Sequence, residues 1–203
     1  MPRRNRVTPF GEIVATPERG LLMGNRGVLC DASGAIVRAW QVRRWIACRT
    51  DFRGRWRPAV TPGRWTALYF LDEATALAAG HRPCGECRYD DHRRFTAAFG
   101  AAHGVAERRV DAVDRILHLD RLDDRRDKRT YVATVAELPD GAMVEVDGTA
   151  SLVRAGALWR WTPGGYGAPR EAPGGELVVL TPRSVVAAIA AGYAPALHPS
   201  AGG

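Results

Sequence analysis

The sequence contains almost no lysine and no long apolar run. Lys128 is the only lysine among 29 basic residues, so the positive charge of the chain comes from arginine. No uninterrupted apolar stretch approaches the roughly 20 residues that a transmembrane helix requires. The first residues, MPRRNRVTPF, also lack the apolar segment of a secretory signal peptide. The sequence therefore predicts a cytoplasmic protein without a membrane partner.

Cysteine is scarce as well. The chain has 4 cysteines, whereas small disulfide-bonded scaffolds carry a much higher proportion. Two of them, Cys84 and Cys87, form a Cys-x-x-Cys pair. In an intracellular protein this spacing is more typical of a metal site than of a disulfide. We therefore expect free thiols that bind a metal ion.

The cysteine pair follows a segment with clear local signals, within residues 65–95. An aromatic, strand-like run, WTALYF, leads into an alanine-rich helix for which Asp72 is a suitable N-cap. Gly80 suits the left-handed conformation that often ends a helix. The pair then falls in the tight turn Pro-Cys-Gly-Glu-Cys, where two thiolates can bind one tetrahedral ion. A second helix is expected to begin near Tyr89.

A tetrahedral structural zinc site needs two more ligands. Cys48 lies at the end of a predicted strand, QVRRWIAC. Cys30 lies where the first strand of a predicted hairpin over residues 27–40 stops. Both can converge on the pair, and if Cys30 is a core thiol instead, His81 or His92 is the next candidate. The predicted zinc ligands are Cys30, Cys48, Cys84 and Cys87.

The stretch LYFLDEATALAAGHRPCGEC resembles the zinc-binding half of the Ada-type DNA repair domain, locally over residues 65–88. The shared features are an aromatic run, an alanine-rich helix and an Ala-Gly-aromatic-Arg-Pro-Cys-x-x-Cys ending, in which His81 is the aromatic residue. In that family an upstream Cys-x-x-x-Cys supplies two further ligands, one of which accepts a methyl group from a DNA phosphotriester. Cys48 matches the first position, but Phe52 stands at the second and cannot bind a metal. The resemblance therefore implies zinc and DNA binding without methyl transfer.

Arginine is concentrated in the first part of the chain. Residues 131–203 contain 4 arginines and 6 acidic residues, so the net charge of +7 comes from the residues before them. Residues 49–64, RTDFRGRWRPAVTPGR, interleave arginines with aromatic side chains. Guanidinium groups can pair with phosphates while rings stack on bases. A solvated basic loop whose Trp56 packs on the core is the alternative. The predicted nucleic-acid contacts are Arg49, Arg53, Arg55, Trp56, Arg57 and Arg64.

The patterning predicts an α+β fold in three parts. Residues 1–20 are expected to form a basic, loosely docked arm. Residues 21–129 are expected to form a zinc-stapled unit with a β-hairpin and helices. Residues 130–203 contain short apolar runs separated by Pro-Asp-Gly, Asp-Gly and Pro-Gly-Gly turns, which predict a small β-rich module. A C-terminal helix that begins at Thr181-Pro182 closes the module.

These features favour a zinc- and DNA-binding protein of repair, modification or defence type. A metal-dependent nuclease or other DNA-processing enzyme is the main alternative, because carboxylates and a histidine base can support phosphodiester hydrolysis. Acidic residues in the first turn of a helix are also explained by the helix dipole. A structural zinc protein that acts through protein partners is the third possibility. The candidate catalytic residues are Asp91, His92, His118 and Asp120.

Overall fold

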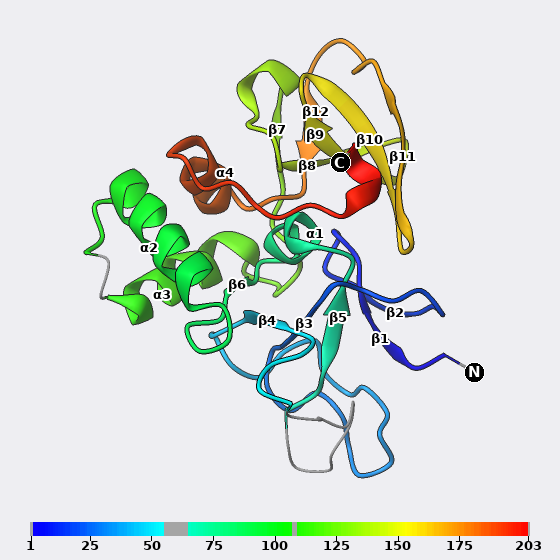
Figure 1. The fold of residues 1–203 in the computed structure, drawn as a ribbon, viewed down its shortest axis with the longest axis vertical. Helices are drawn as coiled ribbons and strands as arrows, with labels where there is room; N and C mark the ends of the chain where they lie inside the picture. The colour runs from blue at the N-terminus through cyan, green and yellow to red at the C-terminus, as the bar shows by residue number, and fades with distance from the viewer. Residues whose placement is uncertain (1, 55–64, 107–108, 203) are drawn as a thin grey trace.

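The computed structural model describes residues 2–54, 65–106 and 109–202. Within these ranges the chain forms two 6-stranded sheets with helices between and beside them (Figure 1). The α+β prediction is confirmed, and so is the presence of a C-terminal helix. No helix in the described ranges is both long and apolar enough to cross a membrane.

The first sheet has the strand order β2-β1-β5-β3-β4-β6. It combines antiparallel pairs with two parallel ones, β1 with β5 and β4 with β6. Its strands are β1 (Arg4–Val7), β2 (Ile13–Ala15), β3 (Leu22–Asn25), β4 (Ile46–Arg49), β5 (Leu68–Phe70) and β6 (Arg82–Pro83).

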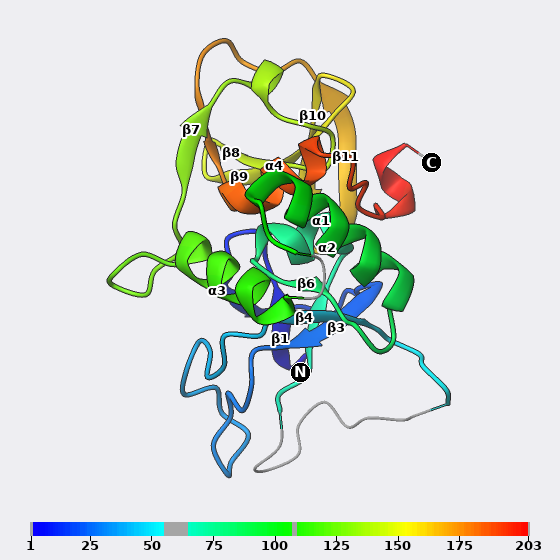
Figure 2. The ribbon, with the colours of Figure 1, turned by 90° about the vertical axis from the view of Figure 1, so that its left-hand side faces the viewer.

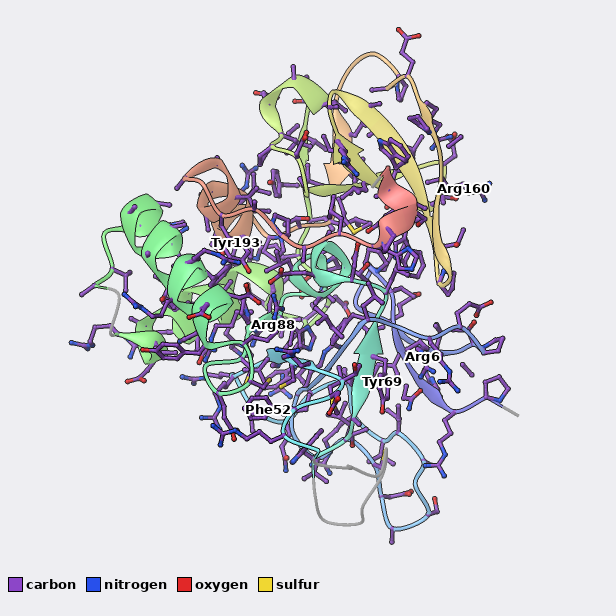
Figure 3. The ribbon with its side chains drawn as sticks, in the orientation of Figure 1. Arg6, Phe52, Tyr69, Arg88, Arg160 and Tyr193 are labelled. Atoms are coloured by element: carbon purple, nitrogen blue, oxygen red, sulfur yellow. The ribbon has the colours of Figure 1, made fainter. Side chains whose placement is uncertain are left out.

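The expected N-terminal arm is in fact part of this sheet. β1 lies between β2 and β5, and Val7 and Ile13 are buried in the core. The guanidinium carbon of Arg6 lies 4.8 Å from the centroid of the Tyr69 ring (Figure 3). Burial alternates along RNRV, with Asn5 and Val7 buried and the two arginines more exposed, as in a strand with one face on the core. The expected domain division is corrected here, because residues 4–15 belong to the first sheet.

The hairpin expected over residues 27–40 is reduced to one isolated bridge, between Cys30 and Ile36. The carboxylate of Asp31 stabilises the turn by accepting the backbone N–H of Ser33 at 2.9 Å and of Ala35 at 3.1 Å. This side chain replaces part of a strand ladder, as Asp often does in turns. The strand expected over residues 41–48 forms only in its last part, as β4, and it extends to Arg49.

The second sheet has the order β11-β10-β9-β8-β12-β7. The short apolar runs expected as strands after residue 130 contribute to it, and β11 is an additional strand. Its strands are β7 (Tyr131–Ala133), β8 (Met143–Val146), β9 (Thr149–Arg154), β10 (Ala157–Thr162), β11 (Gly165–Arg170) and β12 (Leu177–Val179). A short 3₁₀ turn, η1 (Val135–Glu137), follows β7. A second one, η2 (Pro199–Ala201), is the last element of the described residues.

Helix α1 (Glu73–Ala78) lies between the two sheets, and all its residues are buried (Figures 1 and 2). Asp72 caps it as predicted, because its Oδ1 accepts the Thr75 N–H at 2.9 Å. The other carboxylate oxygen, Oδ2, accepts the Tyr166 hydroxyl at 2.9 Å. Ala74 and Ala78 pack against the second sheet, whereas Ala76 packs against the first. The two expected units therefore share this helix and its core.

Three further helices lie together on one side of α1 (Figures 1 and 2). They are α2 (Tyr89–His103), α3 (Val110–Arg121) and α4 (Arg183–Ala190). α2 begins at Tyr89 as expected, and its Phe95 and Phe99 are buried with Leu117 of α3. α4 adds Val185 to the same core. This packing holds α2 in place, and the cysteine turn directly precedes the start of this helix.

Candidate metal centre

Three cysteines from distant parts of the chain meet at one edge of the first sheet. The sulfur atoms of Cys48, Cys84 and Cys87 all lie within 4.8 Å of one another. Cys48 belongs to β4 and Cys84 follows β6, and these strands pair in parallel. The Cys84 N–H donates to the Ala47 carbonyl at 2.9 Å, which continues the pairing to the cysteine itself. The group can hold a metal ion.

Backbone N–H groups point at two of the sulfurs. The Arg49 N–H donates to Cys87 Sγ at 3.4 Å, and the Glu86 N–H donates to Cys84 Sγ at 3.4 Å. Such outer contacts orient thiolate ligands and stabilise their negative charge. Cys48 and Cys84 are also buried beside Met23 and Ala67, so water has little access to their sulfurs.

The three thiol groups lie close enough to change one another's pKa. Hydrogen bonds from Cys48 and then Cys87 lower the pKa of Cys84, whereas the hydrogen bond to Cys84 raises the pKa of Cys48. One thiolate is thus stabilised at the expense of its neighbours. A cation bound at the centre would displace the thiol protons and favour the thiolate form of every cysteine ligand.

Two arginines that flank the cysteine turn are held by buried ion pairs. Arg82 donates from Nε and Nη2 to the two carboxylate oxygens of Asp114, both at 2.8 Å. On the other side of the turn, Arg88 Nη2 lies 2.7 Å from Glu73 Oε1. Glu73 also accepts the hydroxyl of Tyr193, which approaches from the segment after α4 (Figure 3). The turn is therefore anchored to α1, α3 and the C-terminal segment, which sequence reasoning had missed.

Cys30 does not join this group, so the predicted set of four cysteines is corrected to three. Its sulfur accepts the Thr66 hydroxyl at 3.5 Å. It also lines a separate cavity with Arg3 and Ser33. The physical reason is that residues 27–40 do not pair with β4, so their end is not delivered to the cysteine turn.

The two histidine alternatives differ in position. His81 is fully buried, with its ring centroid 4.6 Å from that of Phe70 and 5.3 Å from that of Trp45, so it is a core residue. His92 lies against the cysteine turn instead. Its Nδ1 is 3.2 Å from the Pro83 carbonyl oxygen. A Cβ added at Gly85 would lie 3.4 Å from its Nε2.

The residues considered for a nuclease do not converge. Asp91 forms ion pairs with Arg88 and Arg94 at the start of α2. Asp120 accepts both the N–H and the hydroxyl of Ser184 at 2.6 Å, so it caps α4. Within the described ranges, the cysteines form the one group of three or more potential metal ligands. Neither His92 nor His118 is part of it, and Nδ1 of His118 contacts Arg121 at 2.9 Å.

Two of the predicted nucleic-acid contacts can be placed. Arg49 and Arg53 are exposed, and Arg49 directly follows a cysteine of the centre. The Arg53 guanidinium carbon lies 5.0 Å from the Phe52 ring centroid. Neither arginine forms an ion pair within the described ranges. The other predicted contacts lie outside the described residues: Arg55, Trp56, Arg57 and Arg64.

The chemistry of the centre follows from its ligands. Thiolates prefer zinc, copper(I) and iron–sulfur clusters to magnesium or calcium. The geometry therefore supports a metal site but does not identify the metal. Comparison with known proteins adds no relative, because no family model, curated protein or solved structure matches the chain.

Proposed function

We propose that the chain is a zinc protein that binds nucleic acid, most directly DNA, in a repair, modification or defence setting. One observation carries the proposal: the three-cysteine centre lies beside exposed arginines that have no ion-pair partner within the described ranges. Arginine without a carboxylate partner is available to phosphate oxygens. The resemblance of residues 65–88 to the Ada-type domain supports the choice of DNA.

The zinc in this proposal is structural. Phe52 stands where the Ada-type domain has its second upstream cysteine, so the methyl-accepting ligand set is incomplete. Cys48 is also buried among apolar neighbours. Zinc that joins β4, β6 and the start of α2 would stabilise the sheet edge next to Arg49 and Arg53. Protein partners and nuclease activity remain the competing functions, the latter without a converged catalytic group among the described residues.

This proposal assigns the fourth ligand to His92, whose ring would have to move closer to the sulfurs, because the group formed by the three cysteines contains no histidine nitrogen. Its Nδ1 contacts the Pro83 carbonyl, an arrangement that leaves Nε2 for a metal and fixes the ring. Burial lowers its pKa, which keeps the imidazole in the neutral form that coordinates metals. Three cysteines and one histidine form a common tetrahedral set for structural zinc.

Replacement His92→Ala should lower zinc affinity by at least about tenfold, because even outer contacts of metal ligands contribute roughly 10–100-fold. His92→Cys should retain most of the affinity, since a thiolate can take the same role. Arg93→Ala changes an exposed neighbour on the same helix and should have no effect. Competition with a chromophoric chelator measures all three. Equal affinity of His92→Ala and wild type would place the fourth ligand elsewhere.

The double variant Arg49→Ala/Arg53→Ala should bind DNA more weakly than wild type. Its log–log dependence of affinity on salt should be flatter by about 2 units if each arginine meets one phosphate of duplex DNA. The charge-matched control is Arg160→Ala/Arg170→Ala, which removes two exposed arginines of the second sheet, the first marked in Figure 3.

Fluorescence titrations against single- and double-stranded DNA at several salt concentrations measure both double variants. The control should retain the wild-type slope. If wild type binds neither form of DNA even at low salt, the nucleic-acid proposal is lost and the protein-partner alternative leads. Cleavage of the DNA by the zinc-loaded protein would favour the nuclease alternative instead.

A further inference from the structure

A small cavity lies outside the metal centre, between the first sheet, the end of α1 and the end of α3. Its volume is about 180 Å³, and its wall includes four basic residues, of which Arg126 is exposed and the other three are not. Arg26 follows β3, Arg121 ends α3, and Lys128 lies in the connector after α3. The ring of Trp45 forms part of the same wall. Pockets for drug-sized ligands are roughly 300–1,000 Å³, so this cavity suits a smaller ligand.

Among the described residues, no carboxylate forms an ion pair with the basic residues of this cavity. Glu12 and Asp127 also line the cavity. In the described part of the chain, however, no ion pair joins either of them to a basic residue of the wall. The cations donate to neutral backbone carbonyls instead, which satisfy hydrogen bonds but do not neutralise charge. These carbonyls belong to Gly11, Gly80, Arg43 and Ala78.

Two guanidinium donors in this cluster have no acceptor. Arg26 Nη2 and Arg121 Nε are buried without a hydrogen-bond partner among the described residues. Both arginines are only 2% exposed. Their guanidinium carbons lie 4.3 and 3.8 Å from the centroid of the Trp45 ring, so stacking fixes both groups. A buried, charged donor without an acceptor is unfavourable, and a bound anion would remove that cost.

The pKa values of Arg26, Arg121 and Lys128 are all lowered, as expected where buried positive charge is in excess. Burial lowers the pKa of Arg26 to about 9. Burial and the nearby charge of Arg26 lower the pKa of Arg121 to about 9 and that of Lys128 to about 7. Such lowered pKa values are expected where cations lie close together and are poorly solvated. An anion at the same place would offset both effects.

We propose that this cavity is a binding site for a phosphate group, either free phosphate or the terminal phosphate of a small molecule. Two guanidinium groups and one ammonium group offer fork-shaped and point-charge donors to a compact oxyanion. A phosphate dianion compensates the cluster better than a single carboxylate does. The site is separate from the cysteine centre and does not depend on zinc or on DNA binding.

Calorimetric titration of the intact protein with inorganic phosphate tests the proposal, against sodium chloride of equal ionic strength. We expect saturable phosphate binding and a rise in melting temperature that chloride does not reproduce. Lys128→Met and Arg26→Gln should each weaken phosphate binding at least about tenfold, as loss of a charged hydrogen bond would. Arg125→Met removes an exposed arginine of the same connector and should bind phosphate like wild type.

Two further arms complete the test. Titration with deoxyadenosine 5′-monophosphate distinguishes the sources, because binding shows that the cavity admits a phosphomonoester and its absence restricts the site to free phosphate. If a variant fails to fold, the nitrogen–proton spectrum of wild type still decides: phosphate should shift the Nε–H signals of Arg26 and Arg121 and the indole N–H signal of Trp45. Absence of phosphate binding by folded wild type would overturn the proposal, as would unchanged affinity in both cavity variants. The arginine–tryptophan stack would then be purely structural.

Discussion

Replacement Cys84→Ser should release the bound metal and unfold the first sheet. Cys84 belongs to the cysteine group, in which all three sulfurs lie within 4.8 Å of one another. Structural zinc contributes about 10–16 kcal/mol of apparent binding free energy in zinc-finger peptides at neutral pH, and much of it acts as folding free energy. Most domains are stable by only about 5–15 kcal/mol. Loss of even part of the zinc contribution therefore threatens the fold.

Metal content by elemental analysis, a thiol count on the native protein and thermal melts followed by circular dichroism measure this effect. Wild type should carry one zinc ion, and wild type stripped by a chelator should melt like Cys84→Ser. The matched control is Cys30→Ser, which changes a thiol that accepts the Thr66 hydroxyl. It should keep its zinc. A wild type that is fully folded without metal would refute the zinc centre, and metal loss in Cys30→Ser would restore Cys30 as a ligand.

Local features of the cysteine segment could be predicted from the sequence because each depends on neighbouring residues. Asp72 caps α1, Gly80 has the expected positive φ of 81°, and α2 begins at Tyr89. The strands of the second sheet were predictable for the same reason, since turn residues separate short apolar runs. Such signals need no knowledge of the tertiary structure.

Features that depend on distant partners could not be predicted. β1 joins the sheet through a parallel pair with β5, and no local pattern indicates that partner. Cys30 and Cys48 both end apolar runs, but only Cys48 belongs to a strand beside β6. β11 contains two glycines and a proline, residues that weaken strand propensity, yet its pairing with β10 keeps it in the sheet.

The environment of each arginine in the first part of the chain also could not be predicted from the sequence. Their number predicted a basic surface, and Arg49 and Arg53 are exposed as that prediction requires. Arg26 and Arg121 look no different in sequence, yet both are buried around an aromatic ring. Whether an arginine meets solvent, a carboxylate or a cavity is decided by tertiary packing. Only the structure therefore separates the exposed arginines from those that line the cavity.

Replacement Asp114→Ala should destabilise the protein by about 3–5 kcal/mol, because it leaves the buried guanidinium of Arg82 without a counter-charge. The side chains of Arg82 and Asp114 are 3% and 12% exposed, and two hydrogen bonds of 2.8 Å join them. At about 2–4 °C per kcal/mol for a chain of this size, the melting temperature should fall by roughly 6–20 °C. Asp111→Ala removes an exposed carboxylate from the first turn of the same helix and should cost at most about 1 kcal/mol.

A second variant separates stability from metal binding. Arg82→Met/Asp114→Leu replaces the ion pair by apolar side chains of similar size and should recover most of the lost stability. Arg82 also donates to the Pro83 carbonyl at 3.1 Å, next to Cys84, so the ion pair holds the cysteine turn in place. The double variant should therefore fold well but bind zinc more weakly than wild type in a chelator competition. Wild-type zinc affinity in this variant would mean that the strand pairing of β4 with β6 is sufficient to position the turn. An Asp114→Ala variant within about 1 kcal/mol of wild type in urea unfolding would show that water replaces the lost carboxylate.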